Sequence, residues 1–95
     1  MVKEIFNYHI IVSGRVQGVG FRYFTKKMAD ELSIYGWVKN MGDGTVEITA
    51  EGAEQLLEDF LKFIKRGPSF SRVKDTRVSK IRLSDYKYSD FKISY

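Results

Sequence analysis

A glycine-rich stretch between two regularly patterned segments constrains the fold of this chain most strongly. Glycine occupies positions 14, 18 and 20 of the run Gly-Arg-Val-Gln-Gly-Val-Gly-Phe-Arg, which ends at Arg22. A β-like run, 8–13, precedes it, and a run with helical spacing, 21–32, follows it. The glycines allow a tight turn with converging N–H groups, and the helix start adds unpaired N–H groups and the positive end of its dipole. The stretch therefore predicts a strand, an anion-binding turn and a helix, with phosphate or sulfate as the expected anion.

Arg22 is unusual at the start of a helix, because the first turn favours acidic side chains. An anion held between Arg22 and the turn would make the guanidinium favourable there, and the alternative is a side chain that simply extends into water. Two better-known phosphate loops do not match. Five residues separate Gly14 from Gly20 where the P-loop has four, and Tyr23 stands where the dinucleotide fingerprint has its third glycine.

Length and composition indicate one small globular domain covering residues 1–95, since 43% of the residues are hydrophobic and seven are Phe. The chain has no cysteine, which excludes a disulfide framework, a thiolate nucleophile and a thiolate metal site. We expect neither a metal nor a cofactor. No apolar run approaches membrane-spanning length and no signal sequence is visible, so we expect a cytoplasmic protein without a membrane partner.

The net charge of +4 is unevenly distributed. Residues 1–61 carry 6 basic and 9 acidic side chains, whereas residues 62–95 carry 10 basic and 3 acidic ones. A basic second half suits either a nucleic acid or a small anion.

The remaining periodicity predicts a second helix at 53–66 and further strands at 36–40, 45–51, 73–83 and 88–95. The order β-α-β-β-α-β with an added terminal strand is an α+β, ferredoxin-like split βαβ plan, with a mixed sheet and two helices on one face. A right-handed crossover makes strands 8–13 and 36–40 parallel, with 45–51 inserted antiparallel between them.

This topology brings Asn40 to the same end of the sheet as the glycine turn. Two strand spacings, about 10 Å, would separate them, a gap that one phosphate and one water can fill. Asn40 would then face Arg22 across an anion site. The alternative is that Asn40 merely flanks the Asp-Gly turn at residues 41–44.

The run Gly14–Arg22, followed by Gly-Trp-Val-Lys-Asn-Met-Gly-Asp-Gly-Thr-Val-Glu at 36–47, resembles the acylphosphatases, and the likeness covers nearly the whole chain. The resemblance implies a monomeric enzyme that hydrolyses the carboxyl-phosphate bond of a small acyl phosphate, with no metal and no covalent intermediate. It implies that Arg22 binds the phosphate and that Asn40 positions the attacking water. It also implies that a loop supplies backbone N–H groups to the phosphate, with the members Arg15, Val16, Gln17, Gly18, Val19, Gly20 and Phe21.

Two other functions share this fold plan. An RNA-binding module needs aromatic side chains on the open sheet face, but strand 45–51 points Thr45, Glu47, Thr49 and Glu51 outward, so we expect no nucleic-acid partner. A carbamoyl-phosphate-binding regulatory domain is the other alternative, because acylphosphatase-like domains occur inside larger maturation enzymes. Contacts from Lys65, Arg66 or Phe70 to the acyl group are a further hypothesis.

Overall fold

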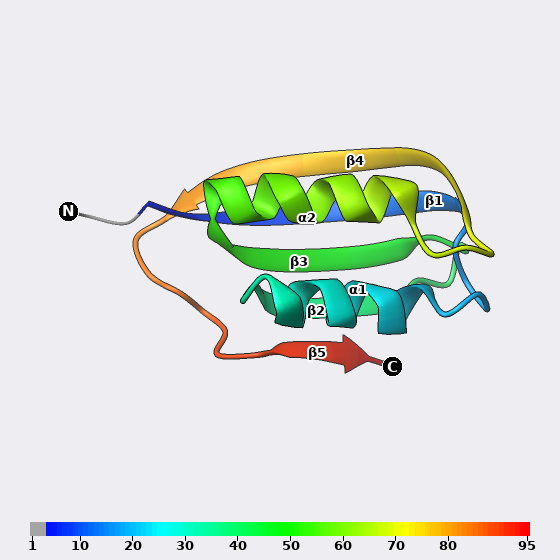
Figure 1. Ribbon diagram of the computed structural model, residues 1–95, viewed down its shortest axis with the longest axis horizontal. Helices are drawn as coiled ribbons and strands as arrows, with labels where there is room; N and C mark the ends of the chain where they lie inside the picture. The colour runs from blue at the N-terminus through cyan, green and yellow to red at the C-terminus, as the bar shows by residue number, and fades with distance from the viewer. Residues whose placement is uncertain (1–3) are drawn as a thin grey trace.

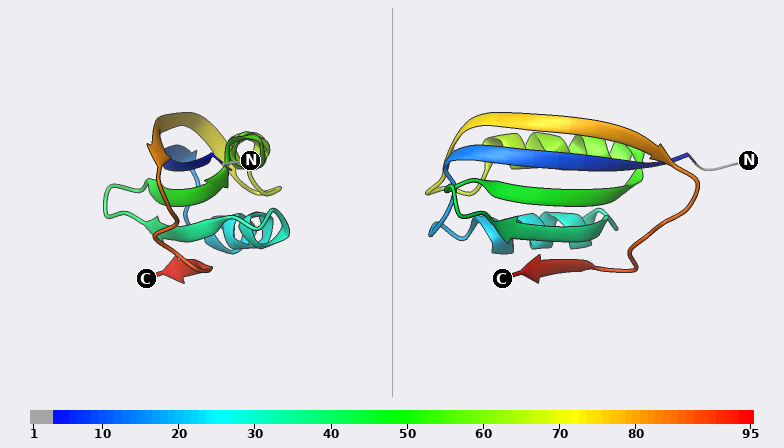
Figure 2. Two further views of the ribbon diagram at one scale, coloured as in Figure 1. Left: turned by 90° about the vertical axis from the view of Figure 1, so that its left-hand side faces the viewer. Right: turned by 180° about the vertical axis from the view of Figure 1, so that it is seen from behind.

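The structure, a computed structural model, describes residues 4–95. Its elements in chain order are β1 (Ile5–Arg15), α1 (Phe21–Glu31), β2 (Tyr35–Asn40), β3 (Val46–Ala53), α2 (Glu54–Arg66), β4 (Arg72–Leu83) and β5 (Phe91–Ser94). Both helices cover one face of a single sheet (Figure 1), and the view from behind shows the other face without a helix (Figure 2). The predicted α+β, ferredoxin-like arrangement is confirmed.

The strand order explains how the two ends of the predicted site meet. The order is β4-β1-β3-β2-β5, and β3 pairs antiparallel with both β1 and β2, as the sequence predicts. The chain therefore leaves β1 and β2 at the same end of the sheet, where the glycine turn and the β2–β3 turn lie (Figure 1). The terminal strand β5, whose place the sequence leaves open, pairs parallel with β2 at the sheet edge.

The core lies between the sheet and the helices. Alternate residues of β1 and β3 point into it, as do four apolar residues of α2: Leu57, Phe60, Leu61 and Ile64. The residues of α1 that are buried after Phe21 are the small Thr25 and Ala29. Small side chains let the helix approach the sheet closely, while the larger Phe24 and Met28 pack around that contact and are partly buried.

The expectation that Glu51 points into solvent is wrong, because this carboxylate is completely buried. The segment 84–90 links β4 to β5 around the end of the sheet (Figure 2), and the backbone N–H groups of Lys87 and Tyr88 donate to Glu51 Oε1 at 2.8 and 3.2 Å. Glu51 thus supplies acceptors to a segment that has no strand partner of its own. These two hydrogen bonds hold the segment that leads the chain from β4 to β5.

The buried Tyr8 hydroxyl joins the sheet to α2 by donating a hydrogen bond to Glu58, which also accepts one from Lys80 Nζ at 2.9 Å. Burial, together with the nearby Glu58 carboxylate, raises the pKa of the Tyr8 phenol. The Tyr8 and Lys80 hydrogen bonds lower the pKa of Glu58. The phenol is therefore neutral and the carboxylate ionised at neutral pH, which keeps this link intact.

Gly36 lets β2 lie against β3, and we expect its replacement to be strongly destabilising. Its φ is +141°, and a Cβ there would lie 1.9 Å from the Thr49 carbonyl oxygen. Gly36→Ala should cost about 3 kcal/mol or more of unfolding free energy, because both the backbone angle and the contact must change. Gly42→Ala is the matched control, since a Cβ at that position would meet nothing within 4 Å and the φ of Gly42 is ordinary. Equal denaturation midpoints for the two variants would contradict this prediction.

Candidate active site

The glycine turn ends in a backbone arrangement suited to an anion. Gly20, with φ 76° and ψ 20°, is left-handed and is followed directly by the first helical residue, Phe21. A left-handed residue next to a right-handed one turns successive N–H groups into a concave nest. No side chain caps α1 and no acidic residue stands in its first turn, so its leading N–H groups and its dipole face the same region. The local backbone therefore has the geometry that the predicted anion cradle requires.

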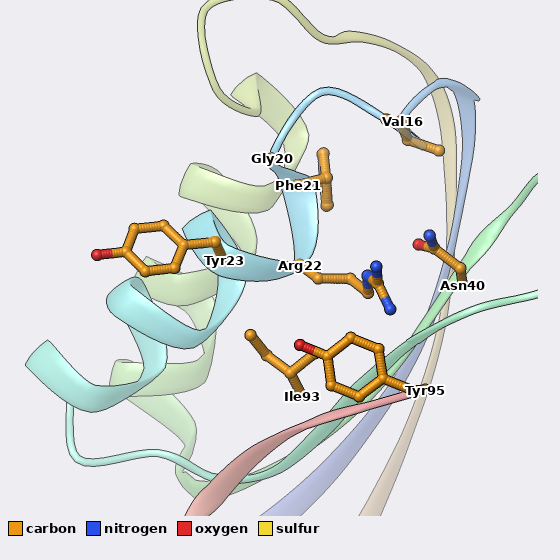
Figure 3. Close-up of a pocket in the computed structure, with 9 residues that line it drawn as sticks. Val16, Gly20, Phe21, Arg22, Tyr23, Asn40, Ile93 and Tyr95 are labelled. Atoms are coloured by element: carbon orange, nitrogen blue, oxygen red, sulfur yellow. The ribbon is translucent and has the colours of Figure 1, made fainter.

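A pocket of about 230 Å³ opens beside this cradle. Figure 3 shows that α1, β2 and β5 surround it. Val16 and Phe21, each only 1% exposed, anchor the turn in the core. The lining residues are Val16, Gly18, Gly20, Phe21, Arg22, Tyr23, Asn40, Ile93 and Tyr95.

Arg22 enters the pocket from the first turn of α1. Its Nη1 donates to the Ser94 carbonyl oxygen at 3.4 Å, and its guanidinium carbon lies 4.7 Å from the centre of the Tyr95 ring. Among residues 4–95, no carboxylate forms an ion pair with Arg22. The guanidinium is thus oriented by the end of β5 while its positive charge stays available for an anion.

Asn40 enters the pocket from the last residue of β2, and its carboxamide points toward the space next to Arg22 (Figure 3). The Asn40 Oδ1 atom is buried and has no hydrogen-bond partner in the described part of the chain. A buried polar atom without a partner costs about 1–3 kcal/mol, so its retention needs an explanation. A bound molecule that donates a hydrogen bond inside the pocket would supply one.

The structure brings some of the predicted site residues together and leaves others outside. Arg22 and Asn40 line one pocket with Val16, Gly18, Gly20 and Phe21. Three predicted loop members do not line it: Arg15, Gln17 and Val19. Arg15 is the exposed last residue of β1 and pairs with β4, while Val19 packs against the core. The Gln17 side chain turns toward the β2–β3 turn instead.

The acyl-contact hypothesis gains no support from these positions. Lys65, Arg66 and Phe70 are absent from the pocket lining, and the Phe70 ring is exposed. Sequence reasoning missed Tyr23, Ile93 and Tyr95 instead. The alternation of Phe91, Ile93 and Tyr95 indicates that their side chains share one face of a strand. It points to the pocket only once β5 is known to lie beside β2.

Other side chains that could take part in catalysis or metal binding do not contribute to this pocket. His9 pairs with Glu47 on the open sheet face at 2.6 Å and does not line the pocket. Within residues 4–95, no three His, Cys, Asp or Glu side chains are grouped to hold a metal ion. The helices of the described region are all too short or too polar to span a membrane.

Comparisons with known proteins cover most of this chain. The acylphosphatase family model matches residues 8–93. An acylphosphatase of Bacillus licheniformis is 52% identical over 88 residues, which make up 93% of this chain and 97% of that protein. The crystal structure of the acylphosphatase from Bacillus subtilis has a TM-score of 0.90 at 49% identity and covers 95% of this chain and 99% of that one.

A part of a larger protein is also similar. Full-length HypF, crystallised in a phosphate- and nucleotide-bound form, matches with a TM-score of 0.89 at 35% identity, over 100% of this chain but 12% of HypF. The range of the family match includes the glycine turn, Arg22 and Asn40. The resemblance seen in the sequence is therefore confirmed, and this chain belongs to the acylphosphatase family of enzymes.

Proposed function

We propose that this acylphosphatase cleaves its acyl phosphate by in-line attack of a water molecule held by Asn40 on a phosphoryl group held by Arg22 and the glycine turn. The proposal includes neither a metal ion nor a covalent intermediate. The observation that carries it is the pairing, in one pocket, of an arginine without a carboxylate partner and a buried amide oxygen without a hydrogen-bond partner among residues 4–95. The guanidinium is suited to bind an anion, and the amide oxygen is suited to accept a hydrogen bond from water.

Arg22 and the backbone nest suit the phosphoryl group. Charge in phosphoryl transfer is spread over three equatorial oxygens, and catalysis is mainly positioning and electrostatic stabilisation. The N–H groups after Gly20 and the Arg22 guanidinium approach the same pocket from the same helix start. These donors are oriented before the substrate arrives, so they stabilise the transition state without a reorganisation cost.

Asn40 suits the attacking water. Its Oδ1 accepts a hydrogen bond from the water, which orients an oxygen lone pair toward phosphorus. The leaving group is a carboxylate, a weak base that needs little help from a general acid. The proton of the water then passes to a phosphate oxygen, because no described carboxylate or histidine lines the pocket.

This reaction is tested with benzoyl phosphate as substrate and inorganic phosphate as inhibitor. Turnover should be unchanged when EDTA is present. Phosphate should inhibit competitively, because it binds where the phosphoryl group of the substrate binds. Loss of turnover in EDTA that added Mg²⁺ restores would contradict the metal-free part of the proposal. Non-competitive inhibition would contradict the shared phosphate position.

One narrower alternative is the carbamoyl-phosphate-binding domain that the sequence also suggests as part of a larger protein, and this chain is similar to a region of the larger protein HypF. Relative turnover of carbamoyl, acetyl and benzoyl phosphate separates the two functions. A general acylphosphatase hydrolyses all three, whereas a carbamoyl-specific domain hydrolyses carbamoyl phosphate alone.

A further inference from the structure

The Gln17 side chain links the glycine turn to the turn that follows Asn40. Its Nε2 atom donates to the carbonyl oxygens of Met41 at 2.8 Å and Thr45 at 2.9 Å. These two acceptors are the first and last residues of the β2–β3 turn, and Met41 N also donates to Thr45 O at 2.8 Å. The carboxamide of Gln17 therefore bridges the two ends of this turn. One of these ends, Met41, directly follows Asn40 in the sequence.

The two segments that Gln17 joins differ in how firmly they are held. Its neighbours on the glycine turn, Val16 and the helix start at Phe21, are anchored in the core. The β2–β3 turn is exposed at residues 42–44, and its internal contacts are local ones, in which Asp43 Oδ1 accepts from the backbone N–H and hydroxyl of Thr45. If the link is lost, we expect the exposed turn to move rather than the anchored one.

We infer that Gln17 is a positioning residue for Asn40, an inference that rests on the water-binding role proposed above. The two hydrogen bonds hold the two ends of the β2–β3 turn, and one of these ends, Met41, directly follows Asn40. The Asn40 side chain, whose Oδ1 is buried, extends from that backbone into the pocket. A displacement of about 1 Å in a positioned group can lower a rate about a hundredfold. Gln17 thus affects the position of the attacking water, whereas Arg22 binds the phosphoryl group.

The chemistry of the contact requires an amide at the end of the side chain. Two carbonyl oxygens face one nitrogen, which a glutamine NH₂ satisfies with its two hydrogens. Methionine has a similar length but no donor, so Gln17→Met removes the two hydrogen bonds and keeps most of the packing. Glutamate would place a carboxylate against two carbonyl oxygens, so Gln17→Glu should lower kcat more than Gln17→Met does.

The test compares Gln17→Met and Gln17→Glu with the control Gln55→Met. Gln55 is an exposed glutamine on α2 whose side chain contacts Asp59 at 3.2 Å, away from the pocket. We expect kcat for benzoyl phosphate to fall about tenfold to a hundredfold in Gln17→Met, with the inhibition constant of phosphate changed by less than about threefold. The control should match the parent protein in both.

A double-mutant cycle with Asn40→Ala, measured at enzyme concentrations that reveal residual turnover, separates positioning from general damage. If Gln17 acts through Asn40, adding Gln17→Met to Asn40→Ala should lower kcat by less than about twofold. An equal loss in both backgrounds would overturn the inference. So would weaker phosphate binding with an unchanged kcat, or failure of both Gln17 variants to fold. The proposed reaction fails by a different result, normal turnover in Asn40→Ala.

Discussion

Replacing Arg22 by alanine is expected to abolish both phosphate binding and turnover. The guanidinium is the charged donor of the pocket, and no described carboxylate pairs with it. Losing charge-assisted hydrogen bonds to an anion should weaken phosphate binding at least about tenfold. The transition state should lose on the order of 3 kcal/mol or more, which lowers kcat/KM at least about a hundredfold.

Two further variants sharpen this prediction, with calorimetric titration of phosphate beside the kinetic assay. Arg22→Lys keeps the charge but not the planar fork, so it should retain part of the binding and little of the turnover. Arg77→Ala removes one positive charge from an exposed position on β4 and should leave both unchanged. Near-normal phosphate affinity in Arg22→Ala would show that the guanidinium does not hold the substrate.

Asn40→Ala is expected to abolish turnover while leaving phosphate binding intact. The variant removes the acceptor for the attacking water but keeps Arg22 and the backbone N–H groups at the start of α1, the donors to which phosphate binding is assigned. We expect kcat to fall at least about a hundredfold and phosphate affinity to change by less than about threefold.

The same variant should be no less stable than the parent protein. Asn40 Oδ1 is buried without a partner in the described region, so removing it eliminates a desolvation cost and no protein hydrogen bond to that atom. An equal or higher denaturation midpoint together with lost turnover would mark Asn40 as a residue kept for activity. A variant that unfolds at lower denaturant, or that loses phosphate binding, would instead indicate a structural role.

The sequence was sufficient to predict the meeting of Arg22 and Asn40, because that prediction depends on topology alone. A right-handed crossover with one strand inserted leaves the ends of β1 and β2 at the same edge, whatever the side chains do. The glycine spacing likewise predicted the sharp turn before α1, since a left-handed residue before a helix start is a backbone property.

Features that depend on long-range packing could not be predicted in this way. A terminal strand can add to either open edge of the sheet, and here the segment 84–90 that leads to β5 is bound by the buried Glu51 carboxylate. Local alternation marks Glu51 as an outward residue and carries no information on what later covers it. For this reason the contacts of Ile93 and Tyr95 with the pocket were missed.

The central claim is that the water held by Asn40 attacks phosphorus, and the most direct measurement is hydrolysis of benzoyl phosphate in ¹⁸O-labelled water. Mass spectrometry of the products shows which of them received the solvent oxygen. If water attacks the phosphoryl group bound by Arg22, the label enters inorganic phosphate and benzoate stays unlabelled. Label in benzoate would mean attack at the carbonyl carbon and would contradict the account.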